Sequence, residues 1–223
     1  MTTRDLHDRW LRLWQHLGAT ADAAPDAAPL LDELLLRYAE PQRAYHTLHH
    51  IRACLADLDR LATASAAAPT TAPAPPEAAL LELAIWYHDA VYDPRARDNE
   101  EQSAALALRA AHAMRLPDAQ ARRLADLILC TKTHDARGSD PLAALLLDID
   151  LAILGAAPDD FARYDHDVRR EYAWVPGFVY RWKRRRVLRQ FLSRVPLYRT
   201  PLFQSLYEEP ARRNLRGALG INP

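Results

Sequence analysis

The amino-acid sequence predicts an all-α protein. Glycine is scarce, with 6 residues among 223, while alanine and leucine are abundant. Apolar residues recur at the three- and four-residue spacing of an amphipathic helix along most of the chain, and no alternating strand pattern of useful length appears. Several prolines stand where helices would begin. These observations favour a bundle of about nine or ten helices, with one substantial core or at most two small ones.

The N-terminal part of the chain contains three helical stripes. Their apolar residues are Leu6, Trp10, Leu13, Trp14 and Leu17, then Leu30, Leu31, Leu34, Leu35 and Tyr38, then Leu48, Ile51, Leu55 and Leu58. Residues 19–29 and 62–76 are rich in Ala and Pro, together with Asp in the first stretch and Thr in the second. Proline cannot continue a helix. We therefore predict loops at both places, the second of them a mobile surface loop within a single domain.

Later helices are marked by their first residues. Asp98 followed by Glu101 fits a capping box, which would open a helix through about Met114. Three further starts are indicated by a proline at the first helical position, namely Pro117, Pro141 and Pro201, with Asp140 and Thr200 as N-caps of the last two.

Charge is balanced overall but unevenly distributed. The chain has 29 Lys and Arg against 29 Asp and Glu. Residues 151–223 carry 14 of these cations and 7 of these acids, so residues 1–150 have a net charge of −7. The basic C-terminal helical extension could meet anions or pair with acidic residues of the same chain, and charge runs are usually solvated faces. Aromatic interleaving is limited to Trp182, so we expect no specific nucleic-acid binding.

The cysteines and the N-terminal residues predict a cytoplasmic protein. Cys54 and Cys130 lack the C-x-x-C spacing of zinc and redox motifs and are typical of small buried residues in a reducing compartment. Charged residues within the first ten positions interrupt any signal-peptide apolar core. No apolar run reaches the length of a membrane span, so we expect no membrane partner. The oligomeric state stays open.

Three separate segments combine histidine with aspartate: YHTLHH at 45–50, WYHD at 86–89 and LDID at 147–150. Among four His-Asp dipeptides, only His88-Asp89 closes an apolar helical run. That run would carry the pair into the interior, where a charged carboxylate persists only if it is paired or bound to a metal. Imidazole and carboxylate groups together suit a mixed nitrogen and oxygen metal site.

The other two segments are less decisive alone. His46 and His50 lie four residues apart, which would place them on one helical face, although surface histidines show the same spacing. Asp148 and Asp150 follow an apolar run and would point about 200° apart on a helix, so only one of them should face a given site.

Taken together, the segments resemble the HD superfamily of metal-dependent phosphohydrolases, whose ligand signature runs H…HD…D on a helical bundle. YHTLHHI is also similar to the Y-H-N-x-x-H segment of cyclic-nucleotide phosphodiesterases, with Thr47 in place of Asn. The closer resemblance is to a small bacterial branch of predicted HD phosphohydrolases. Its pattern of Y-H-x-x-x-H, W/F-H-D-A-V-Y-D, N-E-x-x-S-A and L-D-x-D-L-x-I-L-G reads here YHTLHH, WYHDAVYD, NEEQSA and LLDIDLAILG. This similarity extends from about Pro41 to the C-terminus.

The resemblance implies a divalent metal, whether Mn, Mg, Co, Ni, Fe or Zn, with ligands at His50, His88, Asp89 and Asp150. Asp150 is favoured over Asp148 because Ile149-Asp150-Leu151 fits the family pattern better. Metal-activated water would attack phosphorus in a phosphoester or phosphoanhydride, and His46 would protonate the leaving oxygen. Asp89 could also bridge a second metal. The expected substrate is a small phosphorylated molecule, with a nucleotide as the first candidate.

An anionic substrate needs cations around it. The candidates are Arg43, Lys132, His134 and Arg186, and we expect at least one arginine of 181–189 or 212–213 to face the metal site. Two alternatives stay open. An HD-type di-iron oxygenase would need additional histidines, for which His134 is the candidate, and a non-catalytic module could keep the pocket to bind metal or nucleotide.

Overall fold

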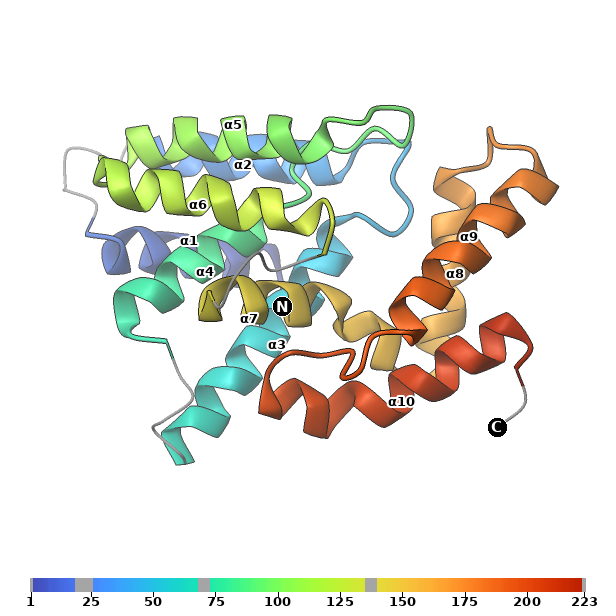
Figure 1. The fold of residues 1–223 in the computed structure, drawn as a ribbon. Coiled ribbons are helices and arrows are strands. Elements are labelled where there is room, and N and C mark those ends of the chain that lie inside the picture. The colour runs from blue at the N-terminus through green and yellow to red at the C-terminus, as the bar shows by residue number, and fades with distance from the viewer. Residues whose placement is uncertain (1, 19–25, 68–72, 135–139, 222–223) are drawn as a thin grey trace. The chain divides into compact units, whose positions relative to one another are not determined.

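A computed structural model describes residues 2–18, 26–67, 73–134 and 140–221 of the chain. Ten α-helices and one 3-10 helix form the described part, which contains no strand, as the sequence predicted. The helices are α1 (Thr3–His16), α2 (Ala27–Tyr38), α3 (Leu48–Ala67), α4 (Pro75–Tyr87), α5 (Asn99–Ala113), α6 (Asp118–Thr131), α7 (Pro141–Asp150), the 3-10 helix η2 (Leu151–Gly155), α8 (Pro158–Glu171), α9 (Gly177–Leu192) and α10 (Pro201–Leu219) (Figure 1).

The chain forms two compact units, Met1–Leu147 and Asp148–Pro223. The division falls inside α7, which is one unbroken helix, and not in a proline-rich linker. The single domain expected from the sequence therefore stays a prediction, and the two units are described separately.

The first unit is organised around α4. This helix is apolar apart from Glu77 and Glu82, and the eight residues Ala79–Leu81 and Leu83–Tyr87 are all buried. A helix with so few polar residues lies inside a bundle, and α4 contacts α1, α3, α5 and α6 (Figure 1). As a result, the residues that follow its C-terminus are delivered into the interior.

Tryptophan side chains pack α1 against α4. Trp10 meets Trp86 edge to face, with ring centroids 5.4 Å apart, and its Nε1 donates to the Ala27 carbonyl at 2.7 Å. Trp14 packs on Trp10 at 6.4 Å. All three rings are at most 3% exposed. Edge-to-face aromatic pairs add stabilisation beyond the area they bury, so α1 belongs to the core of the unit.

The predicted helix starts are confirmed in most cases. Pro141 and Pro201 are the first residues of their helices, and Asp140 accepts a hydrogen bond from the Leu142 amide at 2.9 Å. Pro117 instead precedes its helix, which begins at Asp118. The helix from Asn99 exists, but its capping box does not form.

The missing capping box has a tertiary cause. The Glu101 carboxylate pairs with Lys132 and does not turn back to its own helix start. The Asp98 side chain makes no capping hydrogen bond either. For Glu101, a partner just after the end of α6 has therefore replaced the local motif.

The predicted loops are shorter than expected. Residues 62–67 continue α3 and residues 75–76 begin α4, while 27–29 belong to α2. Alanine has the highest helix propensity of all residues, and α3 extends through the alanine-rich start of the segment. The mobile-loop prediction falls mainly on residues 68–72, which lie outside the described residues.

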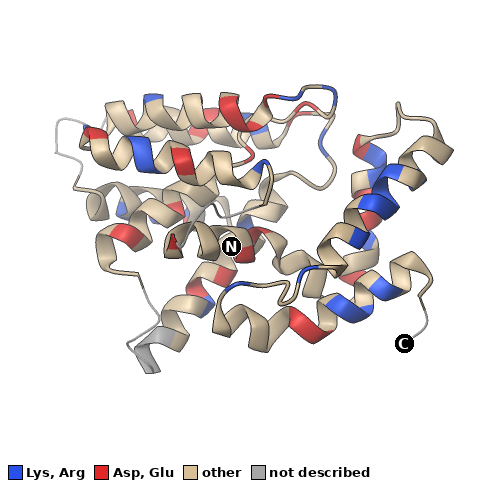
Figure 2. Cartoon of the chain, viewed as in Figure 1, with Lys and Arg blue, Asp and Glu red and all other residues tan. Residues whose placement is uncertain are grey.

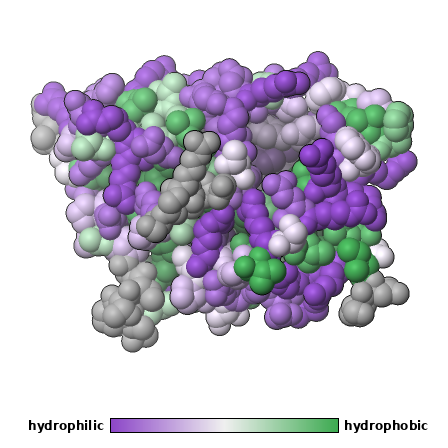
Figure 3. Space-filling view, in the orientation of Figure 1, coloured by the Kyte–Doolittle hydropathy of each residue, from purple (hydrophilic) through white to green (hydrophobic). Residues whose placement is uncertain are grey.

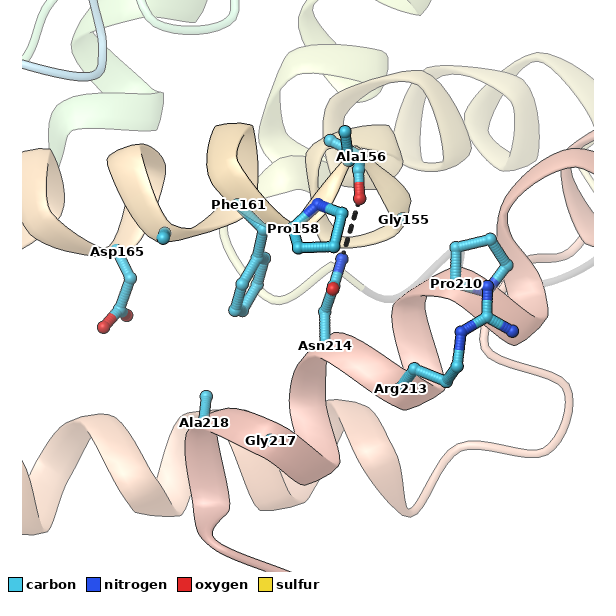
Figure 4. Close-up of a pocket in the computed structure, with 12 residues that line it drawn as sticks. Gly155, Ala156, Pro158, Phe161, Asp165, Pro210, Arg213, Asn214, Gly217 and Ala218 are labelled. Carbon is cyan, nitrogen blue, oxygen red and sulfur yellow. Dashed lines mark hydrogen bonds between the residues drawn. The ribbon is translucent and has the colours of Figure 1, made fainter. Parts of the chain in front are cut away.

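In the second unit, α10 packs against η2 and α9, and α8 packs against η2. Gly155, which ends η2, permits the closest approach. A Cβ atom there would lie 2.7 Å from Tyr207 Cβ and 2.8 Å from the Tyr207 carbonyl oxygen. Asn214 Nδ2 donates to the Leu154 and Ala156 carbonyls at 2.9 Å each, which satisfies carbonyls at the end of η2. Beside this contact is an open cavity of about 780 Å³, lined by Phe161, Arg213 and neighbouring residues (Figure 4).

Lysine and arginine gather on α9 and α10 of the second unit (Figure 2). Within the described residues, no single helix is both long enough and apolar enough to cross a bilayer. The segments Pro141–Gly155 and Pro158–Glu171 meet those conditions together, but across a bend of 105°.

Candidate metal centre

The C-terminus of α4 places the His-Asp pair. His88 caps this buried helix, and Asp89 follows it. His50 lies in the first turn of α3, which packs against α4. Both histidine side chains are buried, at 3% and 1% exposure, while the Asp89 side chain retains 21%. The site is therefore closed on the core side and keeps one partly open edge.

Four residues offer ligand atoms that lie within 4.8 Å of one another: His50, His88, Asp89 and Asp150. His50 Nε2 is 3.2 Å from His88 Nε2 and 3.5 Å from Asp89 Oδ2, and His88 Nε2 is 3.2 Å from the same oxygen. Asp150 is the last residue of α7, a helix whose first seven residues belong to the first unit. No other such group occurs among the residues that the structure describes.

Hydrogen bonds to the far side of each imidazole orient these ligands. His88 Nδ1 is 2.9 Å from the Ile85 carbonyl, which can only accept, so Nδ1 carries the proton and a neutral ring presents the Nε2 lone pair. His50 Nδ1 is 3.0 Å from the Tyr45 hydroxyl. Such partners fix the tautomer and the ring plane of metal-binding histidines. The Nε2 atoms are therefore presented toward one point.

The donor set fits a divalent cation. An imidazole lone pair and an acceptor-only carboxylate 3.2 Å apart repel each other unless a proton or a cation lies between them. Ligand atoms about 2.1 Å from a metal are about 3.4 Å apart in a tetrahedral site and about 3.0 Å apart in an octahedral one. The three separations of 3.2–3.5 Å lie within about 0.5 Å of both values, so they fit a metal without selecting its coordination geometry.

The charge state of Asp89 suits a ligand. Burial alone would raise the pKa of this carboxyl group, but His88, His46 and His50 outweigh it when their rings are protonated, through their positive charges and a hydrogen bond from His88. The pKa is therefore held well below its usual range. Asp89 is an anion at neutral pH and needs no proton loss to bind a cation.

His46 lies beside the group, although not for the reason that the sequence suggested. Because α3 begins at Leu48, His46 precedes the helix and does not share a helical face with His50. Its ring stacks on Tyr92 with centroids 4.1 Å apart and lies 6.2 Å from the His50 ring. Stacking fixes the plane of His46 while leaving its side chain half-buried. Tyr45 and Tyr92, which position the two histidines, were not among the predicted site residues, although Tyr45 belongs to the YHTLHH motif.

Arg43 links the backbone of the two segments that contain His46 and Asp89. Its side chain is fully buried, and its Nη1 donates to the carbonyls of His46 at 2.9 Å and Asp89 at 2.8 Å. Nη2 donates to the Ala90 carbonyl at 3.0 Å, and Nε pairs with Glu40. These contacts favour a structural role over the predicted contact with substrate. Arg43 ties the segment that contains His46 to the segment that contains Asp89.

The other predicted substrate cations are placed differently. Lys132 is exposed and pairs with Glu101, and it also donates to the Arg97 carbonyl at 2.8 Å. His134 is half-buried and lies outside the ligand group. Arg186 is exposed on α9.

The arginines expected to face the metal site lie on α9 and α10 of the second unit. Several of them have partners inside that unit. Arg184 pairs with Asp165 at 2.8 Å, and Arg212 pairs with Glu208. Arg185 donates to the Leu219 carbonyl at 2.8 Å. Arg184 and Arg212 therefore pair with acidic residues of the same chain, which is one of the two outcomes that the charge distribution left open, but these acids belong to the second unit and not to the acidic N-terminal part.

The two aspartates at the end of α7 have separate roles. Asp148 is completely buried and accepts hydrogen bonds from the Arg199 amide at 2.9 Å and from the Thr200 amide and hydroxyl at 2.7 Å each. Its carboxylate is therefore committed to the loop before α10. Asp150 joins the ligand group, as the sequence favoured.

Comparison of the chain with protein-family models, curated protein sequences and solved structures found no match.

Proposed function

We propose that this chain is a metal-dependent phosphohydrolase of the HD type, acting on a phosphoester or phosphoanhydride in a small molecule, with a nucleotide as the first candidate. The observation that carries the proposal is the group of His50, His88, Asp89 and Asp150, whose order along the chain follows the H…HD…D signature. A divalent cation in such a group supplies a nucleophile near neutral pH and neutralises charge on phosphate oxygens.

The chain's own residues provide the remaining functions. Asp89 brings negative charge to the group without first losing a proton. His46, fixed by its stacking on Tyr92, is the candidate proton donor to the departing oxygen, a role that typically contributes a factor of about 10²–10⁴ to the rate. Arg43 holds the backbone of both segments and so keeps His46 and Asp89 at a constant separation.

The alternatives receive less support. A di-iron oxygenase would require further histidine ligands, and the ligand group found among the described residues contains only two histidines. A non-catalytic module would have no need of a histidine held beside the ligands. His46 therefore favours the enzyme.

Elemental analysis of the purified chain, together with a screen of nucleotides and generic phosphoesters in Mn, Mg, Co and Ni, tests the proposal. Asp89→Ala should abolish metal retention and hydrolysis together. His46→Ala should retain the metal and slow turnover by about 10²–10⁴-fold.

His166 and Asp167 provide a matched control, because they form a His-Asp dipeptide on α8 whose histidine side chain is 71% exposed. The double variant H166A/D167A should keep both metal and activity. A metal-loaded chain that hydrolyses none of the panel, or an Asp89 variant that retains its metal, would contradict the proposal.

A further inference from the structure

The second unit contains a long segment without a single acid. Residues 172–207 include eight Lys and Arg and no Asp or Glu. Six of the eight cations lie on α9. Arg184 turns inward, where it pairs with Asp165 and lies over the Tyr164 ring. The other five, Arg181, Lys183, Arg185, Arg186 and Arg189, are exposed, so the helix presents a concentrated positive charge to solvent.

The same segment exposes large apolar side chains. Trp174, Phe178 and Trp182 are 50%, 71% and 63% exposed, and Val187 and Val195 are 40% and 84% exposed. These five are half of the ten exposed large hydrophobic residues in the described part of the chain. Hydrophobic atoms reach the surface at the end of the second unit where α8 connects to α9 (Figure 3). Contiguous exposed apolar patches usually mark an interaction site, and Trp174, Phe178 and Trp182 lie at successive four-residue intervals.

The aromatic rings and the cations share one face of α9. Phe178, Trp182 and Arg186 follow one another at four-residue intervals, and Arg189 lies one turn further, so all four point the same way. The opposite face, with Tyr180, Leu188 and Phe191, is buried. The exposed face therefore has rings toward its N-terminal end and cations toward its C-terminal end.

We propose that this outward face of α9, together with Trp174, binds the surface of an anionic lipid bilayer. Helices that combine Trp or Phe with Lys and Arg lie in the membrane interface, where the rings enter the boundary of the acyl chains and the cations meet anionic headgroups. The absence of acidic residues over 172–207 makes this face complementary to such a surface. The inference is independent of the metal centre.

Other occupants fit this face less well. A second copy of the chain would place like charges against each other, because a two-fold interface brings the same patch together. Single-stranded nucleic acid binds in grooves whose aromatic rings stack on bases. The outward face of a single helix is convex, so it offers no such groove. The sequence analysis expected no membrane partner because no apolar run is long enough to span a bilayer, and that criterion does not detect exposed rings that bind at its surface.

Flotation of the full chain with vesicles tests the proposal. The chain should float with vesicles of phosphatidylcholine and phosphatidylglycerol but not with phosphatidylcholine alone, and raised salt should weaken binding. The variant R186A/R189A should bind more weakly by about 25-fold, from about fivefold for each arginine. R163A/R170A removes the same charge from exposed positions of α8 and should bind as the unmodified chain does.

The apolar contribution is tested separately. F178S/W182S should weaken binding by about tenfold or more for each ring, since each would bury a large side chain. Leu36→Ser and Leu206→Ser, also at exposed positions, should not. Circular dichroism checks that each variant is folded. The proposal is overturned if the unmodified chain does not float with anionic vesicles, if both α9 variants float as well as it does, or if it binds a single-stranded oligonucleotide and no vesicle.

Discussion

Gly155→Ala should destabilise the second unit because no space exists for the added methyl group. The new Cβ would lie 2.7 Å from Tyr207 Cβ and 2.8 and 3.0 Å from the carbonyl oxygen and Cα of the same residue. Ordinary contacts between carbon atoms begin at about 3.5 Å, so η2 and α10 would have to separate by most of an ångström. Two of the three obstructing atoms belong to the backbone, and a rotamer change cannot move them.

The expected size of the effect follows from overpacking. Inserting a methyl group into a packed interface raises the free energy of the folded state by about 1–3 kcal/mol. Because backbone atoms obstruct the new methyl group, we expect a value at the upper end of this range. In a chain of this length each kcal/mol corresponds to about 2–4 °C in melting temperature. We expect the transition to fall by about 5–10 °C.

Gly217→Ala is the matched control. Gly217 lies in α10 and also lines the cavity beside Gly155, but a Cβ atom there meets nothing within 4 Å. Alanine in an open helical position should stabilise the chain by up to about 1 kcal/mol. Thermal and urea unfolding followed by circular dichroism measure both variants. If Gly155→Ala is as stable as the unmodified chain, the close approach of η2 to α10 is not as described.

Three further predictions follow from individual side chains. Tyr45→Phe removes the hydroxyl that contacts His50 and should lower metal affinity by about 10–100-fold, measured by competition with a chelator. Asp148→Ala should lower the free energy of unfolding by about 3 kcal/mol, measured in urea. Asp150→Ala should lose metal, while its free energy of unfolding in the presence of chelator stays nearly unchanged. Equal losses of stability in the two variants would refute the separation of roles. Burial raises the pKa of Glu208, but hydrogen bonds from two backbone N–H groups and an arginine outweigh this effect and lower the pKa. The stability that Glu208 contributes is therefore complete above about pH 4.3, the ordinary pKa of a glutamate. It is lost as the pH falls through the lower pKa that Glu208 has in the folded chain. Glu208→Gln should flatten that part of the pH profile of unfolding, and an unchanged profile would exclude the contribution.

Local signals in the sequence predicted much of the fold. A proline at the first helical position identified the starts of α7 and α10, because proline fixes its own backbone angle within that turn. The Asp140 side chain also caps α7, whereas the predicted cap at Thr200 makes no capping hydrogen bond. The apolar run before His88 predicted the buried helix that carries the ligands. Signals of this kind depend on neighbouring residues only.

The features that the sequence did not reveal share a different cause, which is a partner far along the chain. Glu101 pairs with Lys132, thirty-one residues away, and does not form the predicted capping box. The role of Asp148 depends on Arg199 and Thr200, more than fifty residues later. Arg43 was expected to contact substrate. Its planar guanidinium group instead donates to three backbone carbonyls that the fold brings together. Sequence spacing does not encode such distances.

The distribution of tryptophan has a practical consequence for spectroscopy. Trp10, Trp14 and Trp86 are buried in the first unit, whereas Trp174 and Trp182 are exposed in the second. Buried indoles emit at shorter wavelengths and are shielded from dissolved quenchers such as iodide, while exposed ones are not. The intrinsic fluorescence of the unmodified chain therefore contains two separable signals, and each reports on one unit without any attached label.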